Sequence, residues 1–419
     1  NSPDAWDVIP TSAYHQIEVP ANANITIDYD AITYGDYLAV GLNVEVDENG
    51  VMLGGSIGGM MMWNGSFDIL NVYNGIVFTA GDVFEWLIWD ASTDSYYSAD
   101  AVYDESYPDT DVFSLNPGES GILDLVARTM FTQSIPLPEG WGIYSTYISP
   151  EDNSLETVLS DVAGDLIIMK DEEGHVYWPF LGINNIPNFK DGEGYQIKMS
   201  SDMIGEDALR VSGDLIPSDF EMFMPEGWSY IAYLNRYADA AENSLESLED
   251  NLILVKDGAG QVYWPLIGVN MIGGGDGMMR PGLGYAVKIY NDATFSYPDI
   301  DGGRFAYNPT PIYPLTKYSE STNTGSNMTI GIPFEAWETI PQEGDEIAAY
   351  SKKGMLVGSI TYTGSATAIT VWGDDATTED VEGLLEGEEV TFELWRKSED
   401  KIEVLEVQNW VEGSNIYSE

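Results

Sequence analysis

A tyrosine followed directly by a tryptophan occurs within the letters VYWP at two places, Tyr177–Trp178 and Tyr263–Trp264. In a strand, neighbouring side chains point to opposite faces, so one ring of each pair can be exposed while the other is buried. An exposed ring can stack on a sugar, and this would make the four residues a glycan-binding platform. The alternative is that both tryptophans fill a core or a contact between modules, because tryptophan is usually well buried.

A second group of chemically capable residues lies in the segment GDDATTED, from Gly373 to Asp380. It brings carboxylates and hydroxyls together, and oxygen is the ligand atom that calcium prefers. Asp374 and Asp375 are therefore candidate calcium ligands. The spacing is not that of an EF-hand, and a turn followed by an Asp- or Thr-capped helical turn explains the segment equally well. We expect no cofactor, with bound calcium left open.

The sequence lacks the usual signatures of catalysis. It contains no HExxH or GxxxxGK[ST] segment, and it has 2 histidines and no cysteine. A pair of carboxylates could hydrolyse a glycoside, but among 70 acidic residues no single pair stands out. We predict that the chain is not an enzyme.

The charge of the chain excludes two classes of partner. Its 70 acidic residues face 16 basic ones, which gives a net charge of −54. Such a surface repels nucleic acid and anionic lipid, and the sequence holds no continuous apolar run long enough to enter a membrane. The acidity is explained by solubility in salty water, where charges are screened, or by recognition of a cationic partner.

The elements that carry these residues belong to a duplicated stretch, from Pro138 to Lys198 and again from Pro225 to Lys288. Both copies open with PEGW, continue through NSLE and VYWP, and close with GxGYxxK. The pattern predicts a strand, a short helix over 154–162 or 244–250, a β-hairpin and a final strand.

Matched positions in the two copies predict matched roles. Trp141 and Trp228 are expected to be equivalent core residues, and so are Tyr195 and Tyr285. The glycines of each GxGY segment are expected to form a tight turn before the last strand.

The flanks of the duplicated stretch read as β-structure and echo each other. GDYLAVG at 35–41 parallels GDEIAAY at 344–350, and GDVFEWLIW at 81–89 parallels GEEVTFELW at 387–395. The sequence therefore predicts a mainly β fold, in which two β-sandwich (Ig-like) modules flank two duplicated small α+β modules. The expected boundaries are 1–129, 130–206, 207–298 and 299–419.

These segments resemble known modules. PEGW with YWP and GxGYxxK is similar to the repeated modules of large secreted surface proteins of marine Bacteroidota. GDEIAAY, GMLVGSI, ITVWGDDATTE and GEEVTFELW resemble the β-modules that accompany them there and in marine phage. The first β-module departs from this pattern because it lacks the VWGDD segment. The resemblance implies export and a multi-domain architecture, and it says little about activity.

The two ends of the chain suggest how copies could assemble. The last β-module is expected to lack a closing strand, which would expose backbone groups and core. Trp6, Val8 and Ile9 precede the first predicted strand and have no obvious place in the first module. They are candidate plugs for a neighbouring copy, although a continuation of the polypeptide or a differently closed topology would also fill the gap.

These observations lead to one expected function and two alternatives. The expected function is a non-catalytic extracellular structural or adhesive protein, a segment or subunit of a surface filament, stalk or fibre. The alternatives are a carbohydrate-binding surface protein and a virion fibre or decoration protein. The expected location is extracellular, at the cell surface or on a virion, and the expected partners are other copies of the chain and possible glycans.

Overall fold

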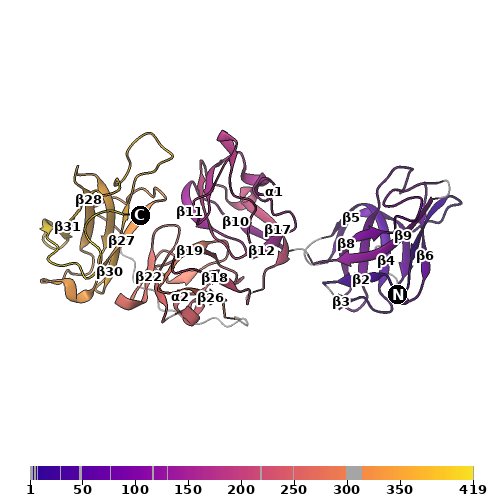
Figure 1. Cartoon of the computed structure of the whole chain (residues 1–419), viewed down its shortest axis with the longest axis horizontal. Helices are drawn as coiled ribbons and strands as arrows, with labels where there is room; N and C mark the ends of the chain where they lie inside the picture. The colour runs from indigo at the N-terminus through magenta and orange to yellow at the C-terminus, as the bar shows by residue number, and fades with distance from the viewer. Residues whose placement is uncertain are drawn as a thin grey trace. The chain divides into compact units, whose positions relative to one another are not determined.

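The computed structural model of the chain describes residues 3, 6, 8–28, 30–46, 50–75, 77–115, 118–129, 131–217, 219–248, 250–298 and 314–418. The chain divides into two compact units, Asn1–Thr132 and Gln133–Glu419, each of which is described by itself (Figure 1). Strands dominate both units and helices are few and short, so the predicted mainly β fold is confirmed. In the described part of the chain, no helix is long and apolar enough to span a bilayer.

The first unit is built on one large sheet. Its strands are β1 (Tyr14–Val19), β2 (Asn24–Ile27), β3 (Asp30–Ala31), β4 (Tyr37–Val46), β5 (Met52–Met62), β6 (Asp68–Tyr73), β7 (Glu85–Asp90), β8 (Ser95–Tyr103) and β9 (Gly118–Ala127). The main path runs β3-β2-β9-β8-β7-β4-β5, and β1 pairs with both β6 and β9. Because side chains alternate along β1, Ile17 and Val19 enter the core together with Leu70 and Val72 of β6.

The first repeat (residues 130–206) belongs to the second unit from Gln133 onward. Its elements are β10 (Phe131–Ile135), β11 (Gly140–Tyr144), β12 (Ile148–Pro150), α1 (Leu155–Val158), η1 (Ser160–Val162), β13 (Leu166–Lys170), β14 (Val176–Trp178), η2 (Pro179–Leu181), β15 (Ile183–Asn184), β16 (Tyr195–Met199) and η3 (Gly205–Asp207). They form a five-stranded sheet in the order β11-β16-β13-β14-β15, and β10 and β12 also flank β17 (Leu209–Leu215), the next strand along the chain, in a small sheet.

The second repeat (residues 207–298) forms the same five-stranded sheet. Its elements are β17 (Leu209–Leu215), β18 (Met222–Met224), β19 (Gly227–Ala232), β20 (Asp239–Ala240), α2 (Ala241–Ser244), η4 (Glu246–Leu248), β21 (Leu252–Lys256), β22 (Val262–Trp264), η5 (Pro265–Ile267), β23 (Val269–Asn270), β24 (Met278–Met279), β25 (Gly284–Ile289) and β26 (Ala293–Phe295). The order β19-β25-β21-β22-β23 repeats that of the first copy, and a register shift falls at matched positions of β13 and β21.

The two repeats join through a reciprocal contact. Tyr144 bridges Leu283 of the second repeat, and Ile231, which matches Tyr144, bridges Glu193, which matches Leu283. A Cβ added at Gly194 would meet the Ile231 carbonyl oxygen at 2.9 Å, and one at the matching Gly284 would meet the Tyr144 carbonyl oxygen at 3.0 Å. The second glycine of each GxGY segment therefore lets the two backbones approach, beyond the expected role in a turn.

The last β-module (residues 299–419) has its described strands β27 (Asn327–Ile332), β28 (Glu346–Ser351), β29 (Leu356–Thr361), β30 (Thr367–Trp372), β31 (Val390–Arg396) and β32 (Lys401–Leu405), with η6 (Phe334–Ala336). Residues 299–313 lie outside the described part. The order β29-β28-β31-β32 matches β5-β4-β7-β8 of the first unit, and the β27–β30 pair matches β1–β6.

A shared detail links the two β-modules more closely. The Trp89 indole donates to Asp94 Oδ1 at 3.1 Å, and the Trp395 indole donates to Asp400 Oδ1 at 3.0 Å. Both aspartates have a positive φ, 56° and 48°, in the turn after a buried strand. An aspartate tolerates this conformation better than most residues, and here a tryptophan fixes its side chain.

The chain ends against the last β-module. Ile416 bridges Glu389, and Tyr417 is buried with its hydroxyl beside Ser326. These contacts cover part of the module with its own chain, and the three possibilities raised for the missing strand stay predictions.

The matched tyrosines and the matched tryptophans differ in how deeply they are buried. Tyr195 and Tyr285 are completely buried, as predicted. Trp141 is 7% exposed, but it lies on the outer face of its sheet and another module covers it. Trp228 is 40% exposed, so the prediction of an equivalent core tryptophan is wrong for it. The predicted helix 244–250 is also wrong, because α2 ends at Ser244 and a single 3-10 turn follows it.

Candidate functional site

The first repeat carries a tryptophan between two lysines on one face of its sheet. Trp141 of β11 pairs with Lys198 of β16, and Lys170 comes from the next strand, β13. Paired residues of antiparallel strands point to the same face, so the three side chains converge. The Lys170 Nζ lies 4.5 Å from the centre of the Trp141 ring, and the Lys198 Nζ lies 5.8 Å from it. We call these three residues the first platform.

The loop after β30 docks on the first platform through Asp375. One oxygen, Oδ2, accepts hydrogen bonds from the Trp141 indole at 2.7 Å and from Lys198 Nζ at 2.8 Å. The other oxygen accepts from the backbone N–H and the hydroxyl of Thr377. Burial alone would raise the pKa of Asp375, but the hydrogen bonds from Lys198, Thr377 and Trp141 lower it to about 2. Asp375 is therefore a buried carboxylate fully paired across two modules.

A second loop of the last β-module closes over the same tryptophan. Gly325 has a φ of +81°, and a Cβ added there would fall 2.6 Å from the Trp141 ring. Its carbonyl oxygen accepts a hydrogen bond from Gln196 at 2.8 Å. The amide of Asn323 donates to the carbonyl oxygens of Trp141 and Gly258 at 3.1 and 2.8 Å. This loop therefore holds the last β-module to both repeats at once.

The second repeat carries the matching residues, and we call them the second platform: Trp228 of β19, Lys256 of β21 and Lys288 of β25. The Lys256 Nζ lies 5.0 Å and the Lys288 Nζ 5.5 Å from the centre of the Trp228 ring. Lys256 is buried and donates to Asn327 Oδ1 at 2.9 Å. No described residue occupies the place over Trp228 and Lys288 that Asp375 has on the first platform.

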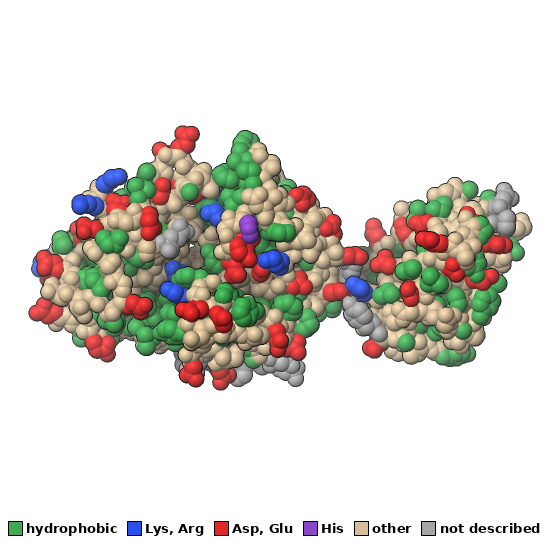
Figure 2. Space-filling model, viewed as in Figure 1, with side chains coloured by type: hydrophobic (Ala, Val, Ile, Leu, Met, Phe, Trp, Pro, Cys, Tyr) green, Lys and Arg blue, Asp and Glu red, His purple; other side chains and the backbone are tan. Residues whose placement is uncertain are grey.

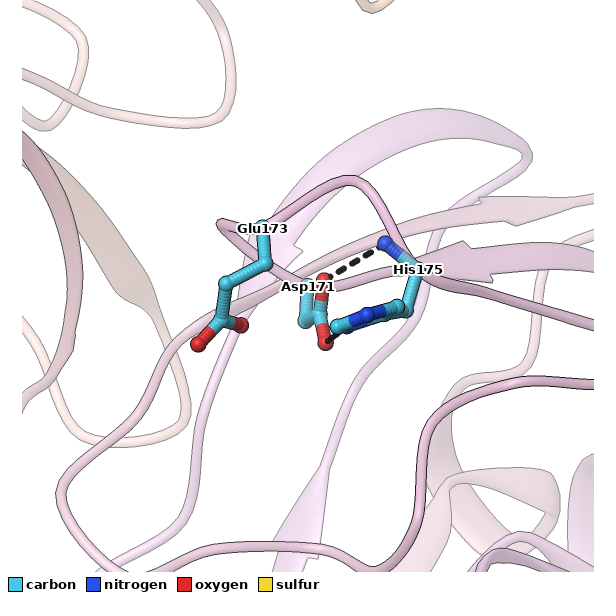
Figure 3. A group of neighbouring side chains, drawn as sticks. All are labelled: Asp171, Glu173 and His175. Atoms are coloured by element: carbon cyan, nitrogen blue, oxygen red, sulfur yellow. Dashed lines mark hydrogen bonds and ion pairs between the residues drawn. The ribbon is translucent and has the colours of Figure 1, made fainter.

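The hairpin turn of the first repeat contains a group that could hold a metal ion. Among the described residues, Asp171, Glu173 and His175 place one ligand atom each within 4.8 Å of one another (Figure 3). Asp171 is buried, and it accepts hydrogen bonds from the backbone N–H and the ring Nδ1 of His175, both at 2.8 Å. Glu173 and His175 are exposed.

The second repeat shows what the buried aspartate of this turn does. Asp257, which matches Asp171, accepts the backbone N–H groups of Ala259, Gln261 and Gly273. Burial raises the pKa of Asp257 to about 6 although these N–H groups lower it. The aspartate thus closes the hairpin turn in both copies, with His175 as a further donor in the first. Glu173 and His175 are exposed and Asp171 is already hydrogen-bonded within the turn, so we assign no metal site to these three residues.

The four residues predicted as a glycan platform have different surroundings. Tyr177 is buried, and Trp178 and Tyr263 are partly exposed. Trp264 packs against the last β-module, because a Cβ at Gly331 would lie 2.7 Å from its ring. Trp264 is therefore engaged in a contact between modules, and glycan binding stays a prediction.

The predicted calcium ligands are engaged by protein donors. Both oxygens of Asp375 are occupied as described above, and Lys198 supplies the positive charge beside it. Asp374 Oδ1 accepts the backbone N–H of Glu382 at 2.8 Å. Calcium binding by these two residues stays a prediction.

The predicted plug residues have a place in their own unit. Trp6 is 5% exposed and packs with Leu87 and Trp89 on the outer face of the first sheet. Val8 joins the same cluster, and Ile9 is exposed. The expectation that this segment has no place in the first module is therefore wrong, because donating it would strip Trp6 from its own sheet.

The docking of Asp375 on Trp141 was missed by sequence reasoning. Its signal was present in the composition: Lys170, Lys198, Lys256 and Lys288 take matched positions in the duplicate, although the chain has only 16 basic residues. Lysines retained twice at the same place in such an acidic chain indicate a carboxylate nearby. Only the structure shows which of the 70 acids it is.

Comparisons with known proteins add little to this description. No family model matches the chain, and no curated protein matches it. One solved structure, the T6 backbone pilin of serotype M6 Streptococcus pyogenes, aligns at 8% identity and a TM-score of 0.15 over 93% of this chain and 78% of that chain. Its title describes a modular three-domain structure with variable loops and extensions. A TM-score this low does not establish a shared fold.

Proposed function

We propose that the chain is a non-catalytic structural or adhesive protein of a cell surface, a segment or subunit of a filament, stalk or fibre. The observation that carries the proposal is the docking of Asp375 on Trp141 and Lys198. This buried ion pair fixes one module against another. Together with the reciprocal junction of the repeats, it makes three consecutive modules one compact unit.

Two of the acids with shifted pKa values, Asp257 and Asp375, support a structural role over a catalytic one. A catalytic acid or base needs a shifted pKa and an atom that can reach a substrate. Asp257 has a raised pKa, but its oxygens accept three backbone N–H groups. Asp375 has a lowered pKa, and both its oxygens are bonded within the protein. Both groups therefore serve to hold loops in place.

The surface supports a location outside the cell. Acidic side chains are scattered over the visible face of each unit (Figure 2), and the net charge is −54. Such a surface keeps a protein soluble in salt, which screens the repulsion among its charges. It also disfavours nucleic acid and anionic lipid as partners.

Electron microscopy of the purified full chain tests the proposal directly. We expect filaments or regular lattices whose repeat does not change between low and high salt, because the contacts that fix the modules are buried. Analytical ultracentrifugation of the same samples measures the fraction assembled. Particles that stay monomeric at every protein concentration would contradict self-assembly. A defined turnover of a glycan or peptide that a single Asp or Glu substitution abolishes would contradict the absence of catalysis.

Carbohydrate binding is the second candidate, and one observation favours it. Next to the partly exposed Trp178, Phe180 is 90% exposed at the tip of the first repeat. A glycan array with the wild type and Trp178→Ala tests this candidate, with Trp264→Ala as the matched control because Trp264 packs against Gly331. Binding that Trp178→Ala abolishes and Trp264→Ala preserves supports it. A virion fibre or decoration protein would instead be recognised by electron microscopy of particles labelled with an antibody against the chain.

A further inference from the structure

The two platforms present the same two donors in the same register. Trp141 pairs with Lys198 across β11 and β16, and Trp228 pairs with Lys288 across β19 and β25. The distance from the lysine Nζ to the ring centre is 5.8 Å in the first platform and 5.5 Å in the second. The first platform shows what these donors bind, because the Trp141 indole and Lys198 hold one oxygen of Asp375.

On the second platform, no described residue serves as an acceptor for these donors. The Trp228 side chain is 40% exposed, against 7% for Trp141. Among the described residues, no carboxylate lies within 4 Å of Lys288 Nζ, and none accepts from the Trp228 indole. A partly exposed lysine beside an exposed tryptophan is unremarkable alone, but the matching pair in the first repeat is seen with its ligand in place.

We propose that Trp228 and Lys288 bind an aspartate-bearing loop of a partner protein, in the way that Trp141 and Lys198 bind Asp375. The partner loop carries an aspartate followed two residues later by a threonine or serine, because Thr377 bonds both Asp375 and Lys198. The indole and the ammonium would hold one carboxylate oxygen, and the hydroxyl would bridge the other oxygen to the lysine.

Within the described part of the chain, no loop of this kind is bonded to the second platform. The chain has two platforms and one GDDATTED segment, whose Asp375 is taken by the first platform. The first β-module lacks the segment, since β6 is followed by Asn74 and Gly75. In a second copy, Asp375 is likewise held by that copy's own first platform, so each copy keeps one open second platform. We therefore place the ligand on a different protein.

The second platform also differs from the first in ways that affect affinity. Gln196, which donates to the Gly325 carbonyl oxygen, is matched by Ala286. Lys256 already donates to Asn327, so Lys288 provides the charge for the ligand. The partner is therefore held by fewer bonds than the last β-module, and its binding depends on charge and weakens with salt.

The test uses the full chain and a synthetic peptide with the sequence of Gly373–Asp380. Binding is followed by the 15N–1H signal of the Trp228 indole, which is assigned with Trp228→Phe. We expect a saturable shift of this signal at millimolar or lower peptide concentration, and a loss of affinity of at least about tenfold in Lys288→Gln. Lys352→Gln, at an exposed lysine elsewhere on the chain, is the control and is expected to bind as the wild type does.

The peptide has its own control, in which the residue that corresponds to Asp375 is replaced by Asn. The proposal is overturned if the wild type does not bind, if the Asn peptide binds equally, or if Lys288→Gln binds as tightly as Lys352→Gln. Dimers of the wild type that form without peptide and disappear in Lys288→Gln would overturn the choice of a different protein in favour of a second copy. These results do not depend on whether the chain forms filaments, so the two proposals fail separately.

Discussion

The contact between Asp375 and Trp141 gives the sharpest test of how the modules are held together. We consider Asp375→Asn, which keeps the size of the side chain and removes its charge. The ordinary pKa of 3.8 falls to about 2 in the folded chain. A difference of about 1.8 in pKa corresponds to at most about 2.5 kcal/mol of stabilisation at neutral pH, since one pKa unit is worth about 1.4 kcal/mol.

The sign of the pH effect follows from the same shift. The carboxylate is favoured in the folded state, so its stabilisation is complete above the unfolded pKa of 3.8 and is lost as the pH falls through the folded pKa of about 2. Wild-type docking should therefore weaken between about pH 4 and pH 2. The variant should be weaker at neutral pH and should change less over that interval.

Hydrogen exchange of the Trp141 indole measures the docking without requiring the whole chain to unfold. We expect Asp375→Asn to lower the protection of this indole by between about 10-fold and about 60-fold at neutral pH. Asp380→Asn, in the same loop and exposed, is the matched control. If both variants protect the Trp141 indole equally, or if wild-type protection is the same at pH 2 and pH 6, the reasoning is refuted.

Three further predictions concern other parts of the second unit. Trp141→Ala should lower the free energy of unfolding by about 3–5 kcal/mol, and Trp228→Ala by no more than about 1–2 kcal/mol because that ring is 40% exposed; urea unfolding compares them, and equal losses would contradict the assignment of only one tryptophan to a buried contact. Gly194→Ala and Gly284→Ala should each cost at least about 1–3 kcal/mol, because the added Cβ would meet a backbone oxygen; the control Gly164→Ala has open space, and thermal unfolding in which all three behave alike would argue against the close junction. Asp257 has a folded pKa of about 6, above its unfolded value of 3.8, so its stabilising contribution should be present below pH 3.8 and lost as the pH rises to 6. The free energy of unfolding of Asp257→Asn should lack this decline. If the wild type and the variant show parallel pH profiles, another group causes the decline.

The succession of strands and turns within each repeat could be predicted from the sequence. Which module packs against which could not. Duplicated segments fold alike because the same alternation and the same turn residues recur, as at Pro179–Gly182 and Pro265–Gly268. Tyr195 and Tyr285 share the interior of matched sheets, so a local comparison places both correctly.

The fate of the matched tryptophans depended on a distant segment. Trp141 is buried by Asp375 and Gly325 of another module, whereas no residue in the described ranges covers its duplicate, Trp228, in this way. A comparison of the two copies predicts equal roles because it sees only the module itself. The same limit applies to Trp264, whose cover is Gly331. The burial of Trp6 was missed for a related reason. This ring lies outside any strand, so the sequence around it has no alternating pattern that would predict its burial.

The contact between Trp141 and Asp375 joins positions 234 residues apart and bypasses the whole second repeat. A pull on the two ends of this unit is therefore carried from the first repeat to the last β-module through a small cluster of side chains, in parallel with the polypeptide between them. The hydrogen bonds of Asn323 and the packing of Trp264 on Gly331 hold the same module to the repeats, so it is attached at several points. Loss of the Asp375 contact alone would therefore remove one attachment and leave every sheet intact.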